Sequence, residues 1–111
     1  EPTTTQIGTV PAGKKPGFWR AGAIGNDFNH QNCLPNLTHR AVDYINRHAQ
    51  DERPFFLYLP LPAPHTPILP AEAFKGKTRL GDYGDFVLMV DDVVGQVREA
   101  LRRNGMTPIP S

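Results

Sequence analysis

A cluster of prolines in the middle of this chain is the feature that most constrains its fold. Of the 12 prolines in the 111 residues, five lie within positions 60–70. Proline lacks a backbone N–H and fixes φ, so it interrupts both helices and strands. We therefore expect one long irregular loop over residues 60–70, with more regular structure on either side of it.

Two amphipathic helices are predicted, one on each side of this loop. Apolar residues recur at three- and four-residue steps in both stretches, with polar residues between them. The first helix is expected over residues 38–50, with Asn36 or Thr38 as its N-cap. The second is expected over residues 83–104, and Gly105 is its predicted C-terminal stop.

The residues between the first helix and the loop predict a buried strand. Residues 55–59 are apolar at every position, which is typical of a parallel strand covered on both faces. A weaker strand or extended segment is expected at residues 18–24. One secure strand is too few for such a sheet. We therefore predict an α/β fold in which this chain is a segment of a larger, doubly covered mixed or parallel sheet domain.

Charge and hydropathy exclude several classes of function. The 12 Lys and Arg and the 11 Asp and Glu are interspersed and give a formal net charge of +1. The chain thus lacks the basic patch typical of proteins that bind nucleic acid or an anionic membrane. No run approaches the roughly 18 apolar residues of a membrane span, and residues 1–5 lack the features of a signal peptide. The single cysteine, Cys33, excludes an internal disulfide and leaves the compartment open.

His65 is the candidate catalytic residue. It lies in the proline-rich loop that follows the predicted strand, and ligands of open α/β sheets bind beyond the carboxyl ends of the strands. The flanking Pro64 and Pro67 restrict the backbone and would hold the imidazole in one direction. Rigid placement suits a hydrogen-bond donor to an oxyanion or a leaving group. The alternative is a solvent-exposed loop histidine.

Lys77 is a second candidate, for substrate binding. It lies at the rim of the His65 loop, where an ammonium group would reach an anionic substrate. Residues 75–78 superficially match the end of a phosphate-binding P-loop, but the upstream glycine, the preceding strand and the immediately following helix are missing. The simpler alternative for Lys77 is a solvated loop lysine.

No metal site is predicted within this chain. The spacings of His30, Cys33 and His39 match no standard zinc pattern. Asp91 and Asp92 are consecutive on the second predicted helix, where side chains point about 100° apart and cannot both face one ion. We expect one of these carboxylates to make a polar contact and the other to be solvated.

Several motifs follow one another along this chain in an order known from one family of enzymes. They are the apolar run 54–58, the Pro-His-Thr-Pro sequence at 64–67, Lys77, and residues 82–85 and 90–95. In order and spacing they resemble the central segment of type I sulfatases, in the alkaline-phosphatase-like superfamily. The resemblance covers about residues 16–106.

The sequence and the resemblance together divide the chain into three parts. Residues 1–17 are polar and contain several Gly and Pro, so they are expected to be a flexible lead or loop. The resemblance implies that residues 18–106 are the central part of a sulfatase-like α/β domain and that residues 107–111 are a tail. It also implies an enzyme that hydrolyses sulfate esters with a formylglycine hydrate beside a divalent metal, usually calcium.

The resemblance carries one site residue onto this chain. The histidine of the family motif that matches residues 64–67 contacts the sulfate group, so His65 is expected to be catalytic. The family's nucleophile signature is not matched at residues 33–37, because Leu37 stands where arginine belongs. We therefore expect a fragment that lacks the nucleophile and the metal ligands and binds no calcium by itself. Its expected partners are a sulfate-ester substrate and the remainder of the parent domain.

Two alternatives stay open from the sequence. Closely spaced prolines favour extended recognition conformations, so the chain could instead be a small non-catalytic module whose loop binds a protein partner. The second alternative is a phosphatase or phosphonate hydrolase of the same superfamily, which would act on phosphate or phosphonate esters in place of sulfate esters.

Overall fold

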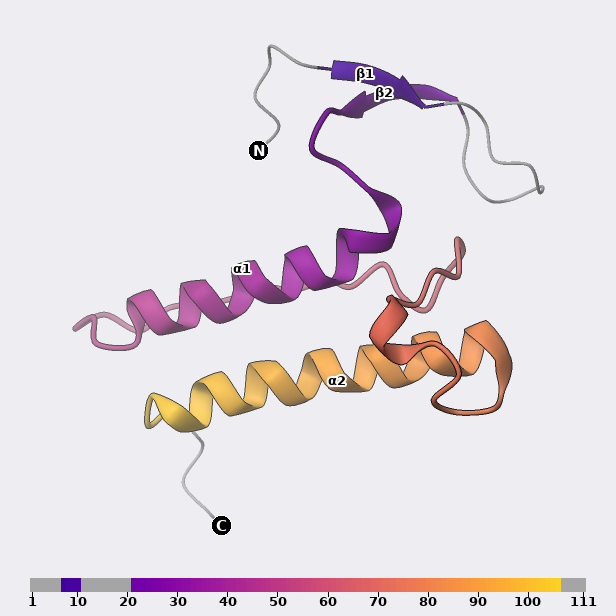
Figure 1. Ribbon diagram of the computed structural model, residues 1–111. Helices are drawn as coiled ribbons and strands as arrows, with labels where there is room; N and C mark the ends of the chain where they lie inside the picture. Colours follow the sequence, from indigo (N-terminus) through magenta and orange to yellow (C-terminus); the bar gives the residue numbers. More distant parts are fainter. Residues whose placement is uncertain (1–6, 11–20, 107–111) are drawn as a thin grey trace.

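The computed structural model describes residues 7–10 and 21–106, and the predicted tail at 107–111 lies outside this part of the chain. Two short strands are followed by two helices, each of which has a 3-10 turn before it (Figure 1). In chain order the elements are β1 (Ile7–Val10), β2 (Gly22–Gly25), η1 (His30–Asn32), α1 (Cys33–His48), η2 (Glu72–Phe74) and α2 (Gly81–Arg103).

Strands β1 and β2 form an antiparallel two-stranded sheet in which Ile7 pairs with Gly25. The sheet lies beyond the N-terminal end of α1 (Figure 1). The prediction of a loop over residues 1–17 is therefore wrong for β1, because a partner strand from later in the chain pairs with it, and the rest of that stretch lies outside the described residues. Strand β2 overlaps the extended segment predicted at 18–24, of which residues 18–20 also lie outside them.

Helix α1 begins five residues before its predicted start. Pro35 is the third residue of α1, where its missing N–H costs nothing because the first four amides of a helix have no intrahelical partner. The predicted N-caps, Asn36 and Thr38, are wrong because both residues lie inside the helix, which begins at Cys33. Thr38 is buried inside the helix, and its hydroxyl donates to the Leu34 carbonyl at 2.8 Å. Before α1, the Asn29 side chain accepts from the Gln31 amide at 2.9 Å and begins the 3-10 turn.

Helix α2 confirms the second predicted helix and its C-terminal stop. Gly105 has a φ of 69°, the left-handed conformation that glycine adopts without penalty. Its amide donates to the Arg102 carbonyl at 3.1 Å, and the Met106 amide donates to the Leu101 carbonyl at 2.8 Å. This pair of bonds is a Schellman motif. No helix of the described residues is long and apolar enough to cross a membrane.

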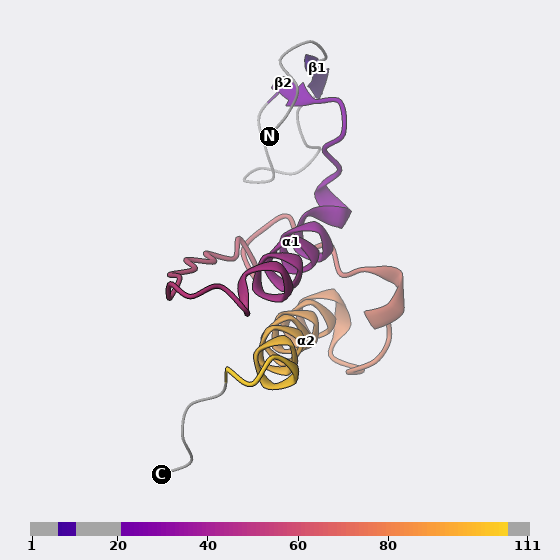
Figure 2. The ribbon, with the colours of Figure 1, turned by 90° about the vertical axis from the view of Figure 1, so that its left-hand side faces the viewer.

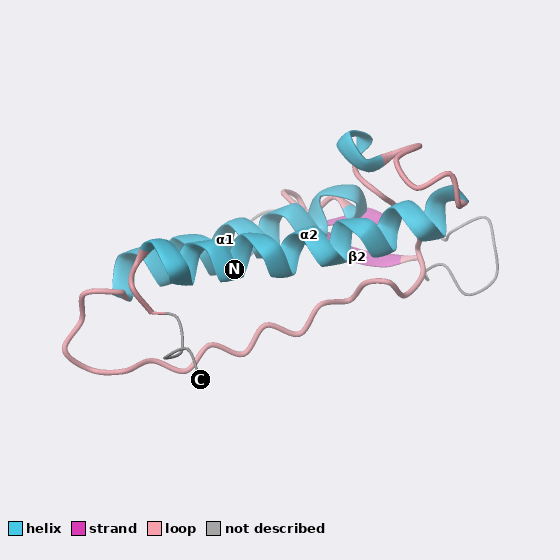
Figure 3. Cartoon of the chain, turned by 90° about the horizontal axis from the view of Figure 1, so that it is seen from below, coloured by secondary structure: helices cyan, strands magenta, loops and turns pink. Residues whose placement is uncertain are grey.

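Residues 55–59 do not form the predicted strand. They are extended and run back along the helix pair, opposite in direction to both helices (Figures 1 and 3). Seen end-on, the segment lies on one side of α1 and α2 (Figure 2). Phe55 packs edge-on against Tyr44, with ring centroids 5.3 Å apart, whereas Phe56 and Tyr58 are 88% and 75% exposed. The described residues offer no neighbouring strand here, so the segment has no hydrogen-bond ladder to join.

The core lies between the two helices and beneath the proline-rich loop. Leu34 of α1 and three residues of α2, Phe86, Met89 and Val93, form its buried centre. The loop packs against this centre through half-buried apolar side chains. These are Leu61, Ala63 and Ile68, and they are followed by Ala71 and by Phe74 of η2, which pack against the same centre. The long irregular loop predicted from the prolines is therefore confirmed, and it is anchored along its length.

We expect truncation of a core side chain in α1 to destabilise the protein strongly. Ile45 is 1% exposed, so Ile45→Ala should lower the free energy of unfolding by about 2–5 kcal/mol through lost burial and a cavity. Denaturant titration of the intact protein measures the change. The control Gln50→Ala removes an exposed side chain and should cost no more than about 0.5 kcal/mol. Equal effects of the two variants would contradict this packing.

Candidate functional site

The backbone around His65 is held in a defined turn. Its amide donates to the Pro62 carbonyl at 3.2 Å, and the peptide bonds Ala63–Pro64 and Thr66–Pro67 are both cis. At the end of the loop Pro70 is fully buried, and its carbonyl accepts from the Gln31 side chain at 3.3 Å. His65 itself is exposed, as the alternative expected, and its backbone lies in a local turn of a loop whose end is anchored at Pro70.

The imidazole of His65 is oriented by its own neighbour. Nδ1 lies 2.8 Å from the backbone oxygen of Thr66 and 3.3 Å from the Thr66 hydroxyl. A carbonyl oxygen can only accept a hydrogen bond, so Nδ1 carries the hydrogen in this contact. The other nitrogen, Nε2, is then an acceptor in the neutral ring and a donor in the imidazolium. This geometry leaves Nε2 as the nitrogen that can act on a ligand.

His65 lines a cavity of about 140 Å³ together with residues that are distant in sequence. One wall is the proline-rich loop, a second is the stretch from Phe28 to Leu34, and Phe86 of α2 completes the lining. The sequence predicted no metal site from His30 and Cys33, and their place in this wall is decided by how η1 folds against the loop. Most of the lining is apolar, with a few polar groups converging on one volume, which is typical of ligand sites.

The remaining sequence candidates lie apart from this cavity. Lys77 is exposed in the loop between η2 and α2 and does not line the cavity, and His39 is exposed on α1. Asp92 accepts a hydrogen bond from Gln96 at 2.6 Å, and Asp91 is exposed, as expected for the pair.

The residues that the structure describes do not fit the calcium site implied by the resemblance. Among them, no three His, Cys, Asp or Glu side chains are grouped so that they could hold a metal ion.

Asp85 organises the loop that carries Lys77. It is 3% exposed, and its carboxylate accepts from the Gly76 amide at 2.7 Å and from the Thr78 amide and hydroxyl at 3.0 and 2.7 Å. The Thr78 hydroxyl, followed by the Thr78 and Gly76 amides, holds the pKa of Asp85 below its ordinary value of 3.8. Both sequence neighbours of Lys77 are therefore bound to one carboxylate.

This arrangement was not predicted from the sequence. The sequence contains a pattern that indicates such a contact. Asp85 lies near the start of the second predicted helix and follows a loop that contains Gly76 and Thr78. The close approach also requires Gly84. A Cβ at Gly84 would lie 2.5 Å from the Cβ of Leu80 and 2.8 Å from the Thr78 hydroxyl. Glycine is thus needed where the loop crosses the start of α2.

Comparison with known proteins identifies the family. The family model for sulfatases matches residues 15–108, which is most of the chain. The chain belongs to the sulfatase family. This sulfatase segment is 42% identical to N-acetylgalactosamine-6-sulfatase of Sus scrofa over 85 residues, which are 77% of this chain and 16% of that protein. The family has an α/β fold, of which the segment contains two helices and a two-stranded sheet.

Other relatives have the same partial coverage. Arylsulfatase D of Homo sapiens is 42% identical over 66 residues, which are 60% of this chain and 11% of that protein. N-acetylgalactosamine-6-O-sulfatase of Bacteroides thetaiotaomicron is 31% identical over 83 residues, 75% of this chain and 16% of the relative. The sulfatase segment thus spans about a sixth or less of the length of these relatives. No solved structure matches it significantly.

We expect Asp85→Asn to release one side of the loop selectively. The amide keeps one oxygen for Thr78 but replaces the other by an NH₂ group, which cannot accept from the Gly76 amide. Hydrogen exchange of the intact protein should show a lower protection factor for the Gly76 amide. The exposed Asp82→Asn is the control in the same helix turn and should leave this protection unchanged.

The same carboxylate predicts a pH dependence. Because the pKa of Asp85 is lowered by folding, its stabilising effect is complete above the ordinary value of 3.8 and is lost as the pH falls through the lowered pKa. Protection of the Gly76 and Thr78 amides should therefore decrease on acidification below about pH 4 in the wild type. Asp85→Asn lacks this titration, and a wild-type-like acid response in that variant would contradict the assignment.

Proposed function

We propose that this chain is the central segment of a sulfatase domain and that it supplies His65 to the hydrolysis of a sulfate ester. The observation that carries the proposal is the orientation of the ring. Nδ1 is bound to the Thr66 carbonyl, so Nε2 is the nitrogen available beside a small cavity. Family membership supports sulfate-ester hydrolysis as the reaction in which this nitrogen acts.

The chemistry of His65 follows from its free nitrogen. As an imidazolium, His65 would donate from Nε2 to the ester oxygen that leaves when a nucleophile from the rest of the parent protein forms a bond to the sulfur and the S–O ester bond breaks. The proton passes from Nε2 to this oxygen, which departs as a neutral alcohol, and the imidazole remains. A positioned general acid of this kind contributes typically 10²–10⁴-fold to a rate. The nucleophile and calcium ligands that the resemblance implies would come from other parts of the parent protein.

Two exposed surfaces support the view that a larger domain surrounds this segment. Phe56 and Tyr58 project from an extended backbone that has no strand partner among the described residues. Helix α2 also exposes large apolar side chains, namely Tyr83, Val87, Leu88 and Val94. Large exposed apolar surfaces mark contacts with further protein. We propose that neighbouring strands of the parent α/β domain pair with residues 55–59 and that the domain covers these faces.

We propose Lys77 as a contact to a part of the substrate that extends beyond the His65 cavity, since Lys77 does not line that cavity. The Asp85 carboxylate holds the backbone on both sides of Lys77, and the lysine itself is exposed. A contact made equally to substrate and transition state affects KM and leaves kcat unchanged. We therefore expect Lys77→Gln in the full-length protein to raise KM for an aryl sulfate several-fold. Loss of kcat without a change in KM would contradict this role.

The proposal for His65 is tested in the full-length protein with an aryl sulfate and the matching aryl phosphate. His65→Gln should lower kcat for the sulfate by about 10²–10⁴-fold, because the amide cannot donate a proton to the leaving oxygen. His39→Gln is the matched control, since His39 is exposed on α1 and outside the cavity.

The outcomes separate the alternatives. Full activity in His65→Gln would remove His65 from the site. Preferential turnover of the phosphate would favour the phosphatase alternative, and turnover of neither ester by the wild type would favour a non-catalytic module.

A further inference from the structure

A hydrogen bond joins two walls of the His65 cavity. The side-chain amide of Gln31, in η1, donates to the backbone oxygen of Pro70, at the end of the proline-rich loop, over 3.3 Å. Gln31 itself lines the cavity, and so do Pro67 and Leu69, which come shortly before Pro70. The two partners are 39 residues apart in the sequence, so only the fold brings them together. The length of this bond therefore helps to set the separation of the two walls.

Both ends of the bond are fixed to the rest of the protein. The backbone amide of Gln31 donates to the Asn29 side chain at 2.9 Å, and η1 leads directly into α1, whose Leu34 lies in the core. Pro70 is fully buried, so its carbonyl oxygen depends on a donor from the protein. Loss of the bond would leave a buried acceptor unpaired, which is unfavourable, so the loop would shift or admit water.

The restraint at Pro70 reaches the His65 ring through the backbone between them. Nδ1 of His65 is bound to the carbonyl oxygen of Thr66, so the direction of the ring follows the plane of the peptide unit between Thr66 and Pro67. The proline rings fix φ at Pro67 and again at Pro70, and Ile68 between them packs against the core. Few backbone torsions are left to absorb a shift of Pro70 before it turns the imidazole.

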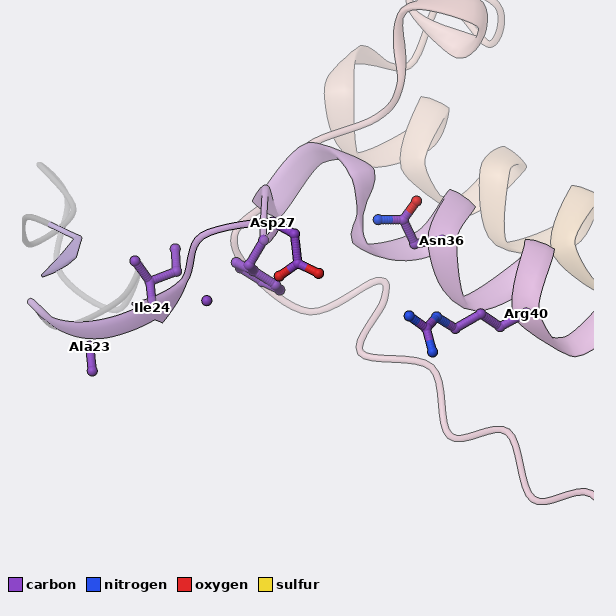
Figure 4. A pocket seen from close by; sticks show the side chains of 7 residues that line it. Ala23, Ile24, Asp27, Asn36 and Arg40 are labelled. Carbon is purple, nitrogen blue, oxygen red and sulfur yellow. The ribbon is translucent and has the colours of Figure 1, made fainter. Parts of the chain in front are cut away.

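The polar side chains next to the Gln31 wall have a different environment. Asp27, Asn36 and Arg40 line a larger hollow of about 440 Å³, which opens to solvent between β2 and α1 (Figure 4). None of these three side chains lines the His65 cavity. They therefore do not join its walls, and a substitution of Gln31 leaves them in place.

We propose that Gln31 is a positioning residue for the reaction at His65. Its hydrogen bond to Pro70 holds the two walls of the cavity together and thereby fixes the direction in which Nε2 of His65 meets the leaving oxygen. This inference rests on the proposed function, which it deepens by naming a residue that acts through His65 rather than on the reacting atoms.

The kinetic test uses the full-length protein and two substrates that differ in their leaving group. A general acid helps a weakly acidic phenol to leave much more than it helps a dinitrophenol, which departs readily as an anion. Gln31→Met keeps the length of the side chain and removes the donor. It should lower kcat for phenyl sulfate by about tenfold or more and for dinitrophenyl sulfate by less than about threefold, and leave both KM values within about twofold.

The matched control is Gln50→Met, which should change neither substrate because Gln50 is exposed and outside the cavity. Gln31→Asn is a second variant that keeps an amide but is one methylene shorter, so its donor falls short of Pro70 and the same pattern is expected. Equal losses on both substrates would make Gln31 merely structural and overturn the inference, as would wild-type kinetics. A raised KM with unchanged kcat would make Gln31 a substrate contact and would also overturn it.

A measurement without turnover separates this inference from the proposed function. In protein with isotope-labelled histidine, nitrogen NMR of the His65 ring reports its tautomer, and His65→Gln identifies the signals by removing them. The wild type should hold the neutral ring with its hydrogen on Nδ1, as the bond to Thr66 requires. Gln31→Met, but not Gln50→Met, should shift the population toward the Nε2–H form. This shift would support the positioning role even if the protein hydrolyses no sulfate ester, and an unchanged tautomer would overturn it.

Discussion

The structure depends on the packing of Leu34 against Phe86, Met89 and Val93 at one end of the helix pair. These side chains bury the apolar faces that the two helices share, and the proline-rich loop lies on them. Leu34 and Phe86 also line the His65 cavity. The hydrophobic contact that holds α1 to α2 is therefore the same contact that forms the wall of the candidate site, so the stability of the core and the shape of the site are coupled.

Two loops carry the candidate residues, and each is restrained by groups from elsewhere in the chain. The His65 loop ends at the buried Pro70, whose carbonyl is bound by Gln31. The Lys77 loop is bound on both sides by Asp85 of α2. Neither loop has a regular hydrogen-bond ladder of its own, so these side-chain contacts satisfy backbone groups that would otherwise be left to solvent.

Local sequence patterns predicted the elements whose stability is local. Helix α2 and its stop at Gly105 followed from apolar spacing and glycine conformation, and the loop over residues 60–70 followed from proline chemistry. The start of α1 was not predicted correctly. Pro35 is compatible with the first turn of a helix, so it does not mark where the helix begins. Residues 55–59 have a strand pattern but no strand partner among the described residues, and a strand forms only where a partner strand pairs with it.

By itself, the sequence determined the order of the helices, the irregular loop between them, the sulfatase motifs and the position of His65 after an apolar segment. Only the tertiary structure decided which nitrogen of His65 is available and which residues share its cavity. The reason is physical. Periodicity and turn chemistry act between near neighbours, whereas a cavity is made by side chains from segments that only packing brings together.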